Sequence, residues 1–312
     1  MNFAFVFPGQ GSQSIGMLAA YGDVAPVQDT LEEASQALGR NLSEMIASGP
    51  ADLLNQTVNT QPAMLVAGVA VYRLWQSLGG PVPTMMAGHS LGEYTALVCA
   101  GALDFSDAVR LVSLRAEAMQ TAVPEGVGAM AAVLGLDDDA IRAVCTEAAR
   151  DEVLEAVNFN SPGQVVIAGN KAAVERGCLL AREKGAKRAL LLPVSVPSHC
   201  ALMRPAADKL RVALADIKVN TPTVAVLHNA DVASHSDPDA IRDALARQLY
   251  SPVRWVETVR TFATQGIELV AECGPGKVLA GLNKRIVDGL PGVALADAAA
   301  LADTLAKIRT QA

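Results

Sequence analysis

The pentapeptide Gly-His-Ser-Leu-Gly at 88–92 has the residue types and spacing of a nucleophilic serine turn, G-x-S-x-G. An apolar stretch at 84–87 predicts a buried strand before it, and residues 91–100 predict a helix after it. Such a turn projects the serine hydroxyl outward, and the flanking glycines let strand and helix pack closely. The N–H of Leu91 would lie at a helix N-terminus, where it can stabilise an oxyanion. We therefore predict Ser90 as a nucleophile and Leu91 as an oxyanion donor.

A serine hydroxyl needs a base to take its proton, and the chain has four histidines. His89 adjoins Ser90 and is poorly placed to serve it, because consecutive strand residues face opposite ways. His235 lies in a polar loop, where a surface role is the simpler interpretation. The end of a predicted strand and the start of a helix favour His199 as the base, with His228 as the alternative. Since no acidic residue stands out as a third member, we expect a Ser-His dyad whose imidazole is held by a carbonyl oxygen.

Two further residues suit acyl chemistry. The turn Phe-Pro-Gly-Gln-Gly at 7–11 can aim the backbone N–H of Gln10 into a cleft as a second oxyanion donor, although an ordinary glycine turn has the same pattern. Arg115 lies on the predicted helix 106–121 and has apolar residues three, four and seven positions away. A cation on an apolar face needs a partner, such as a substrate carboxylate held in bidentate fashion. The alternative is a snorkelling or internally paired arginine.

Alternating strand and helix patterns predict an α/β fold that positions these residues. Between 124 and 193 the pattern changes to a β-α-β-α-β alternation bracketed by prolines, which indicates a small inserted subdomain, and the flanking parts must then close into one larger α/β core. The predicted strands are 3–7, 84–87, 128–134, 164–169, 187–192, 223–227 and 268–272. The predicted helices are 24–38, 61–78, 91–100, 106–121, 137–149, 172–184, 201–215, 240–248 and 253–265.

The composition excludes several classes of protein. The chain has 312 residues and a net charge of -7, which argues against a nucleic-acid binder. Its five cysteines are scattered and include no C-x-x-C pair, so we expect reduced thiols in the cytoplasm, with Cys200 as a small buried hydrophobe. The apolar N-terminus lacks the pattern of a signal peptide, and no apolar run is long enough to cross a membrane.

Taken together, the motifs resemble the malonyl-CoA:acyl-carrier-protein transacylases of fatty-acid synthesis, of the free-standing bacterial type. The resemblance extends in order from residue 5 to about 290. The matching segments are Phe-Pro-Gly-Gln-Gly-Ser-Gln at 7–13, Gly-His-Ser-Leu-Gly-Glu-Tyr at 88–94, Arg115, Asn-Phe-Asn-Ser-Pro-Gly-Gln at 158–164, Pro-Ser-His at 197–199, Gln-Leu-Tyr-Ser-Pro-Val at 248–253 and Gly-Pro-Gly-Lys-Val-Leu at 274–279.

The resemblance implies an α/β fold with a hydrolase-like parallel-sheet core and an inserted ferredoxin-like α+β subdomain. We place the large catalytic subdomain at 1–123 and 194–312, and the small one at 124–193. It also implies residue roles: acylation at Ser90, base and acid at His199, an oxyanion hole at Gln10 and Leu91, substrate carboxylate binding at Arg115, orientation of the imidazole by the carbonyl of Gln248, and supporting cleft positions for His89 and Asn160.

The implied reaction is ping-pong transfer of malonyl from malonyl-CoA to the thiol of holo acyl-carrier protein, without a metal or redox cofactor. Carrier proteins of this kind are acidic, so we expect a local basic rim on a monomeric enzyme. A serine thioesterase or esterase and a polyketide-type acyltransferase are the rival interpretations, and a non-catalytic scaffold is a third. The candidate rim residues are Lys184, Lys187, Arg188, Lys277, Lys284 and Arg285.

Overall fold

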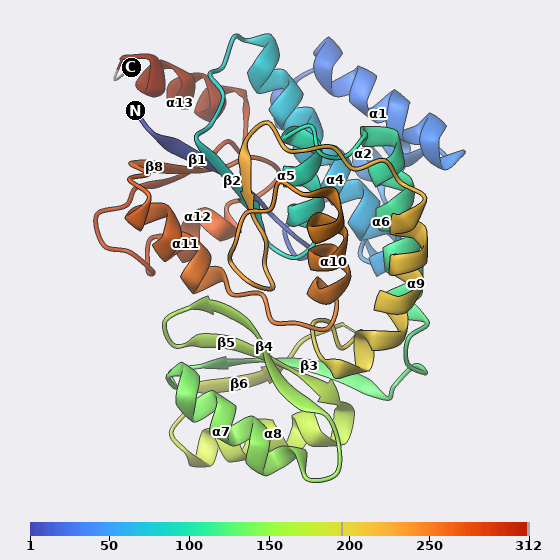
Figure 1. Ribbon diagram of the computed structural model, residues 1–312, viewed down its shortest axis with the longest axis vertical. Helices are drawn as coiled ribbons and strands as arrows, with labels where there is room; N and C mark the ends of the chain where they lie inside the picture. The colour runs from blue at the N-terminus through green and yellow to red at the C-terminus, as the bar shows by residue number, and fades with distance from the viewer. Residues whose placement is uncertain (195, 311–312) are drawn as a thin grey trace.

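The computed structural model describes residues 1–194 and 196–310, so Ser195 and the last two residues of the predicted segment 194–312 lie outside the described residues. Its larger sheet has five parallel strands in the order β7-β2-β1-β8-β9, with helices packed on both faces (Figure 1). This is the expected parallel core. The strands are β1 (Phe3–Phe7), β2 (Met85–Gly88), β7 (Ala225–Leu227), β8 (Leu269–Glu272) and β9 (Gly292–Ala294).

The central strand β1 is apolar throughout because both of its faces are buried. Phe5 packs edge-on against Trp75 of helix α4, with ring centroids 5.2 Å apart. Ala4 and Val6 face the opposite side and join the core cluster that contains Trp255. This two-sided burial fixes the strand that precedes the loop at 8–13.

Helices surround the parallel sheet on its two faces and edges (Figure 1). The expected helices are present with shifted ends; for example, the one predicted at 106–121 begins at Phe105, because the Asp104 side chain caps its N-terminus. The helices of this part are α1 (Ala25–Leu38), α2 (Leu42–Ser48), α3 (Ala51–Leu54), α4 (Thr57–Ser77), α5 (Gly92–Cys99), α6 (Phe105–Gln120), α9 (Arg204–Ala215), α10 (Pro238–Gln248), α11 (Trp255–Thr264), α12 (Val278–Asn283) and α13 (Ala298–Thr310), with 3₁₀ turns at Ala19–Tyr21 and Ala201–Met203.

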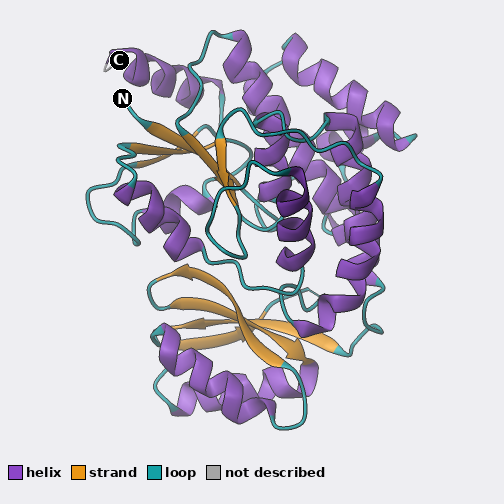
Figure 2. Ribbon diagram, viewed as in Figure 1, coloured by secondary structure: helices purple, strands orange, loops and turns teal. Residues whose placement is uncertain are grey.

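The smaller sheet is antiparallel, has the order β4-β5-β3-β6, and carries two helices on its outer face (Figure 2). Its β-α-β-β-α-β sequence is the ferredoxin-like arrangement, which agrees with the expected inserted subdomain. The boundaries at 123/124 and 193/194 remain our proposal. The elements are β3 (Gly128–Leu134), α7 (Asp138–Ala149), β4 (Leu154–Ser161), β5 (Gln164–Asn170), α8 (Lys171–Glu183) and β6 (Arg188–Leu191).

Strand β4 was absent from the residue pattern read along the chain. Its pairing with β5 shifts between Ala156 and Asn158 and again between Phe159 and Ser161. Such bulges interrupt the alternation of apolar and polar residues on which strand prediction depends. The same strand also contacts the large subdomain, because Phe159 N–H donates to the carbonyl of Val253 at 3.0 Å. The small subdomain is thus hydrogen-bonded to the chain just before α11.

Glu272, the last residue of β8, is a buried carboxylate beside the N-terminus of α12. Its Oε2 accepts from the N–H of Ala280 at 2.8 Å, while Oε1 has no partner among the described residues. Burial raises the pKa of Glu272 to about 7. Because the folded protein holds this proton more tightly than the unfolded chain, the stabilising contribution is complete below about pH 4.5 and is lost as pH rises through 7.

Replacing Glu272 by Gln keeps an oxygen acceptor for Ala280 and removes the titration. We expect the free energy of unfolding of the wild type, measured relative to Glu272→Gln, to fall by at most about 3 kcal/mol between about pH 5 and 8. Urea unfolding at several pH values measures this difference. Parallel stability curves for the two proteins would show that the buried carboxylate does not titrate in this range.

Candidate active site

Ser90 lies on a sharp turn between β2 and α5, with a positive φ of 52°. The neighbouring glycines are needed for close approach: a Cβ on Gly88 would lie 1.8 Å from the carbonyl carbon of Gly92, and one on Gly92 would lie 2.0 Å from the carbonyl oxygen of Phe7. The strand and helix therefore pack as the G-x-S-x-G spacing predicts, and the half-buried Ser90 lies at the carboxyl end of β2.

The structure brings His199 to this serine. Its Nε2 lies 2.7 Å from Ser90 Oγ, and its Nδ1 lies 2.8 Å from the backbone carbonyl oxygen of Gln248. The carbonyl can only accept, so Nδ1 carries the proton and Nε2 is free to accept the serine proton. The alternative prediction, that His228 is the base, is wrong. This residue is fully buried, and its Nδ1 lies 2.7 Å from Oε1 of Glu93.

The pKa of His199 is lowered to about 3, first by burial, then by the positive charge of Arg115, with a smaller contribution from His89. The hydrogen bond from Nδ1 to Gln248 opposes this shift. A lowered pKa keeps the imidazole neutral, and therefore able to accept a proton, far below the pH at which an ordinary histidine becomes charged.

The two expected oxyanion donors face no competing acceptor. Within residues 1–194 and 196–310, the backbone N–H groups of Gln10 and Leu91 make no hydrogen bond. A Cβ on Gly9 would lie 2.4 Å from the carbonyl oxygen of His89, so the loop that carries Gln10 lies against the serine turn. The arrangement leaves both N–H groups available for a developing oxyanion.

Arg115 is 1% exposed and reaches the nucleophile from α6. Its Nη2 lies 3.3 Å from Ser90 Oγ and 3.0 Å from Oε1 of Gln248, while Nη1 lies 2.6 Å from Oε1 of Gln61. Among the described residues no carboxylate pairs with this guanidinium; both of its firm partners are neutral amides. The guanidinium is therefore held by neutral hydrogen-bond partners, and the carboxylate of Glu93 acts on it only through space.

His89 and Asn160 lie together beside the serine turn. His89 Nε2 is 2.8 Å from Asn160 Oδ1, and the imidazole packs on Trp255 with ring centroids 5.5 Å apart. Burial lowers the pKa of His89. Asn160 comes from β4, so this pair joins the small subdomain to the serine turn.

Residue patterns missed a buried network beneath the serine. Asn229 Oδ1 accepts from Ser90 N–H at 2.7 Å, and its Nδ2 donates to the carbonyl of Gly88 at 2.6 Å. Glu93 accepts from the N–H of Asn229 at 2.9 Å and from Nε2 of Gln248 at 2.8 Å. The available signal was a single acidic residue in the first helical turn, three positions after Ser90.

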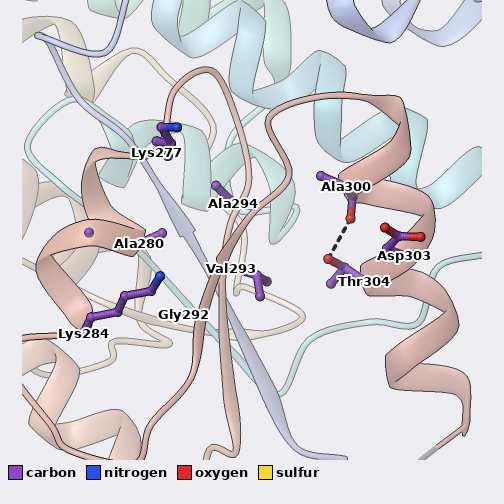
Figure 3. A pocket seen from close by; sticks show the side chains of 10 residues that line it. Lys277, Ala280, Lys284, Gly292, Val293, Ala294, Ala300, Asp303 and Thr304 are labelled. Atoms are coloured by element: carbon purple, nitrogen blue, oxygen red, sulfur yellow. Dashed lines mark hydrogen bonds between the residues drawn. The ribbon is translucent and has the colours of Figure 1, made fainter.

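A separate cavity of about 560 Å³ lies between α12, β9 and α13, lined in part by Lys277, Lys284 and Asp303 (Figure 3). The hydroxyl of Thr304 donates a hydrogen bond to the carbonyl of Ala300 (Figure 3). Its lining residues include neither Ser90 nor His199 nor Arg115. The candidate active site is therefore the one at the carboxyl edge of the parallel sheet.

A parallel α/β sheet with a G-x-S-x-G turn and a histidine hydrogen-bonded to its serine is typical of enzymes that form acyl-serine intermediates. Residues 4–307 match the family described as "Acyl transferase domain". The chain belongs to this family and is an acyltransferase. Among residues 1–194 and 196–310, no helix combines the length and apolar character needed to cross a bilayer.

Individual relatives agree with this assignment. The "Malonyl CoA-acyl carrier protein transacylase" of Escherichia coli (strain K12) is 61% identical over 305 residues, covering 97% of this chain and 99% of that protein. A crystal structure of the acyl-carrier-protein S-malonyltransferase from Burkholderia pseudomallei 1710b has a TM-score of 0.97 and 62% identity, covering 98% of this chain and 100% of that chain. A malonyl-transacylase in complex with a type II PKS acyl-carrier protein has a TM-score of 0.97 and 54% identity, covering 98% of this chain and 100% of that chain.

The lowered pKa of His199 predicts how Ser90 reacts with a neutral serine-directed phosphonate. Because the base stays unprotonated, the rate constant should fall by less than about twofold between about pH 7.5 and pH 5. Mass spectrometry of labelled protein over time measures it, with Ser90→Ala as the control for other sites. A fall of about tenfold or more, with a midpoint near the ordinary histidine pKa, would contradict this.

Proposed function

We propose that this enzyme transfers the malonyl group from malonyl-CoA to the phosphopantetheine thiol of acyl-carrier protein through an acyl-Ser90 intermediate. The observation that carries the proposal is the buried guanidinium of Arg115, which lies beside the Ser90 hydroxyl without an acidic partner among the described residues. The names of the relatives at 61% and 62% identity support the same substrate and acceptor.

In the first half-reaction, Ser90 Oγ attacks the thioester carbonyl carbon while His199 Nε2 takes the hydroxyl proton. The N–H groups of Gln10 and Leu91 hold the oxyanion of the tetrahedral intermediate. The intermediate collapses by breaking its carbon–sulfur bond, and the coenzyme A sulfur leaves with the proton from His199. The malonyl group is then an ester of Ser90, with its free carboxylate on Arg115.

In the second half-reaction the carrier-protein thiol gives its proton to His199 and attacks the ester carbonyl. The carbon–oxygen bond to Ser90 breaks, the serine regains the proton from His199, and malonyl leaves on the carrier protein. The hydrogen bond from His199 to Gln248 keeps the same tautomer in both halves. Substrates therefore alternate on one site, as in ping-pong kinetics.

Arg115 separates a malonyl transferase from a plain esterase or thioesterase. A buried cation interacts strongly with an anion because water is excluded, and an acyl chain without a carboxylate leaves that cation uncompensated. A malonyl carboxylate adds charge-assisted hydrogen bonds that an acetyl group lacks. The second candidate function is the same malonyl transfer to a polyketide carrier protein. The similarity to a malonyl-transacylase in complex with a type II PKS acyl-carrier protein favours it.

Replacing Arg115 by Ala should lower kcat/KM for malonyl loading of Ser90 by about 10²-fold to 10³-fold, and leave acetyl loading within about tenfold of wild type. The physical reason is loss of the only proposed partner for the free carboxylate. Intact-protein mass spectrometry after rapid mixing with each acyl-CoA measures both rates.

The matched control is Arg110→Ala on the same helix, because Arg110 is exposed and pairs with Asp107 at 2.6 Å. It should load malonyl as the wild type does. If Arg115→Ala loses malonyl and acetyl loading in equal proportion, the guanidinium serves the fold or the oxyanion, and carboxylate recognition is excluded as its role.

We also propose a basic rim for the acidic carrier protein, centred on Lys187 and Arg188 at the start of edge strand β6. Both side chains are exposed, and neither forms an ion pair within the described residues. Lys184 pairs with Glu147 at 2.6 Å, and Arg285 donates to Gln164 at 2.8 Å, so both are partly committed. The remaining candidates, Lys277 and Lys284, line the separate cavity (Figure 3).

Reversing both charges with Lys187→Glu and Arg188→Glu should lower kcat/KM for transfer to carrier protein about tenfold or more at low salt, and by less at high salt. Loading from malonyl-CoA should change by less than about twofold. Steady-state assays in which malonyl-CoA and carrier protein are varied in turn distinguish the loading reaction from the transfer reaction. Lys307→Glu on α13 is the control reversal, and an equal loss there would exclude a local docking rim.

The compartment and oligomeric state complete the proposal. All five cysteines are free thiols, and four of them are buried. Reduced thiols are usual in the cytoplasm, where we place the enzyme. We also propose that it acts as a monomer.

A further inference from the structure

Glu93 is fully buried in the first turn of α5, three residues after the nucleophile. Its Oε1 lies 2.7 Å from Nδ1 of His228. Its Oε2 accepts from the N–H of Asn229 at 2.9 Å and from Nε2 of Gln248 at 2.8 Å. The two contacts to Oε2 come from groups that can only donate, so this carboxylate is held as an acceptor below the serine turn.

The contacts with Glu93 and with the Ser90 carbonyl determine which way the Gln248 amide points. Its Nε2 donates both to Glu93 and to the backbone carbonyl of Ser90, at 2.9 Å. Because both neighbours on that side are acceptors, the NH₂ group must face them. The carbonyl end, Oε1, is then directed at Nη2 of Arg115, 3.0 Å away.

A second branch of the network holds the main chain of the serine turn. Glu93 accepts from the backbone N–H of Asn229. The side chain of Asn229 in turn bonds Ser90 N–H and the Gly88 carbonyl. Ser90 has a positive φ, a conformation that persists only where surrounding contacts hold it.

We propose that Glu93 is a positioning residue that sets the direction of the Arg115 guanidinium through the Gln248 amide and so determines the preference for an acyl group with a free carboxylate. This inference rests on the proposed function, because it assigns the preference to Arg115. Glu93 touches neither substrate nor the reacting atoms. It acts by fixing the orientation of the Gln248 side-chain amide, which contacts both the Arg115 guanidinium and the serine turn.

The imidazole of His228 allows Glu93 to be replaced by a neutral residue without loss of its hydrogen bonds. Its Nε2 has no partner within residues 1–194 and 196–310, so the imidazole can place its proton on either nitrogen. In Glu93→Gln, the new NH₂ group can donate to Nδ1 of His228 while the new oxygen accepts from Asn229 and Gln248. Every hydrogen bond is then retained, whereas Glu93→Ala removes them all.

The test measures the ratio of malonyl to acetyl loading on Ser90 by rapid mixing and intact-protein mass spectrometry. We expect Glu93→Ala to lower this ratio about tenfold or more, and Glu93→Gln to stay within about threefold of wild type. Thermal unfolding and circular dichroism of each variant report the folded fraction. A purely structural role would reduce both loading rates together and would leave the ratio unchanged.

Arg115→Ala is measured beside these variants. It distinguishes failure of the positioning role of Glu93 from failure of the carboxylate preference assigned to Arg115. An unchanged ratio in Glu93→Ala with a lowered ratio in Arg115→Ala overturns the positioning role alone. An unchanged ratio in Arg115→Ala overturns the carboxylate preference and the positioning role together. If Glu93→Ala does not fold, Gln248→Met tests the same connection, because it keeps the backbone carbonyl for His199 and removes the amide; an unchanged ratio in that variant overturns the proposal.

Discussion

A single buried cation determines how the rest of this site is arranged. Arg115 is 1% exposed, yet its partners within the described residues are amide oxygens and a hydroxyl. Burying a charge without a salt-bridge partner is costly, so the surrounding protein must hold it with several hydrogen bonds. The guanidinium also lowers the pKa of His199, and its Nη2 lies 3.3 Å from Ser90 Oγ. Arg115, His199 and Ser90 therefore form one electrostatic unit.

The fold brings these groups together from distant parts of the chain. Ser90 follows β2 in the parallel sheet, Arg115 lies on α6, and Gln248 ends α10. His199 follows the small subdomain, and Asn160 comes from its bulged strand β4. The site therefore lies where the two sheets meet, which is a common place for an enzyme cleft. A substrate bound there would contact both subdomains.

Much of this site could be predicted from the sequence because its motifs are local. A strand, a glycine-flanked serine and a helix are adjacent in the chain, so Ser90 and Leu91 could be proposed from spacing alone. With four histidines, elimination favoured His199 and left His228 open, and the contacts of His199 with Ser90 and of His228 with Glu93 distinguish them. The apolar neighbours of Arg115 indicated its burial, but its neutral partners come from α4 and α10 and leave no local signal.

The parts that escaped prediction depend on long-range contacts or irregular geometry. The bulges of β4 disrupt its alternation, and α2, α3, α12, α13 and β9 were also missed. Glu93 and Asn229 are 136 positions apart, so no pattern within one segment connects them. Their hydrogen bonds exist only once β7 has paired beside β2 in the sheet.

The most direct test of the central claim is intact-protein mass spectrometry after brief mixing with malonyl-CoA, followed by addition of holo acyl-carrier protein. Acetyl-CoA and Ser90→Ala serve as comparisons. We expect a malonyl adduct on the wild type, little acetyl adduct on the wild type, and no malonyl adduct on Ser90→Ala. The malonyl group should then move to the carrier protein. Absence of an adduct, or an adduct lost only to water, would contradict it.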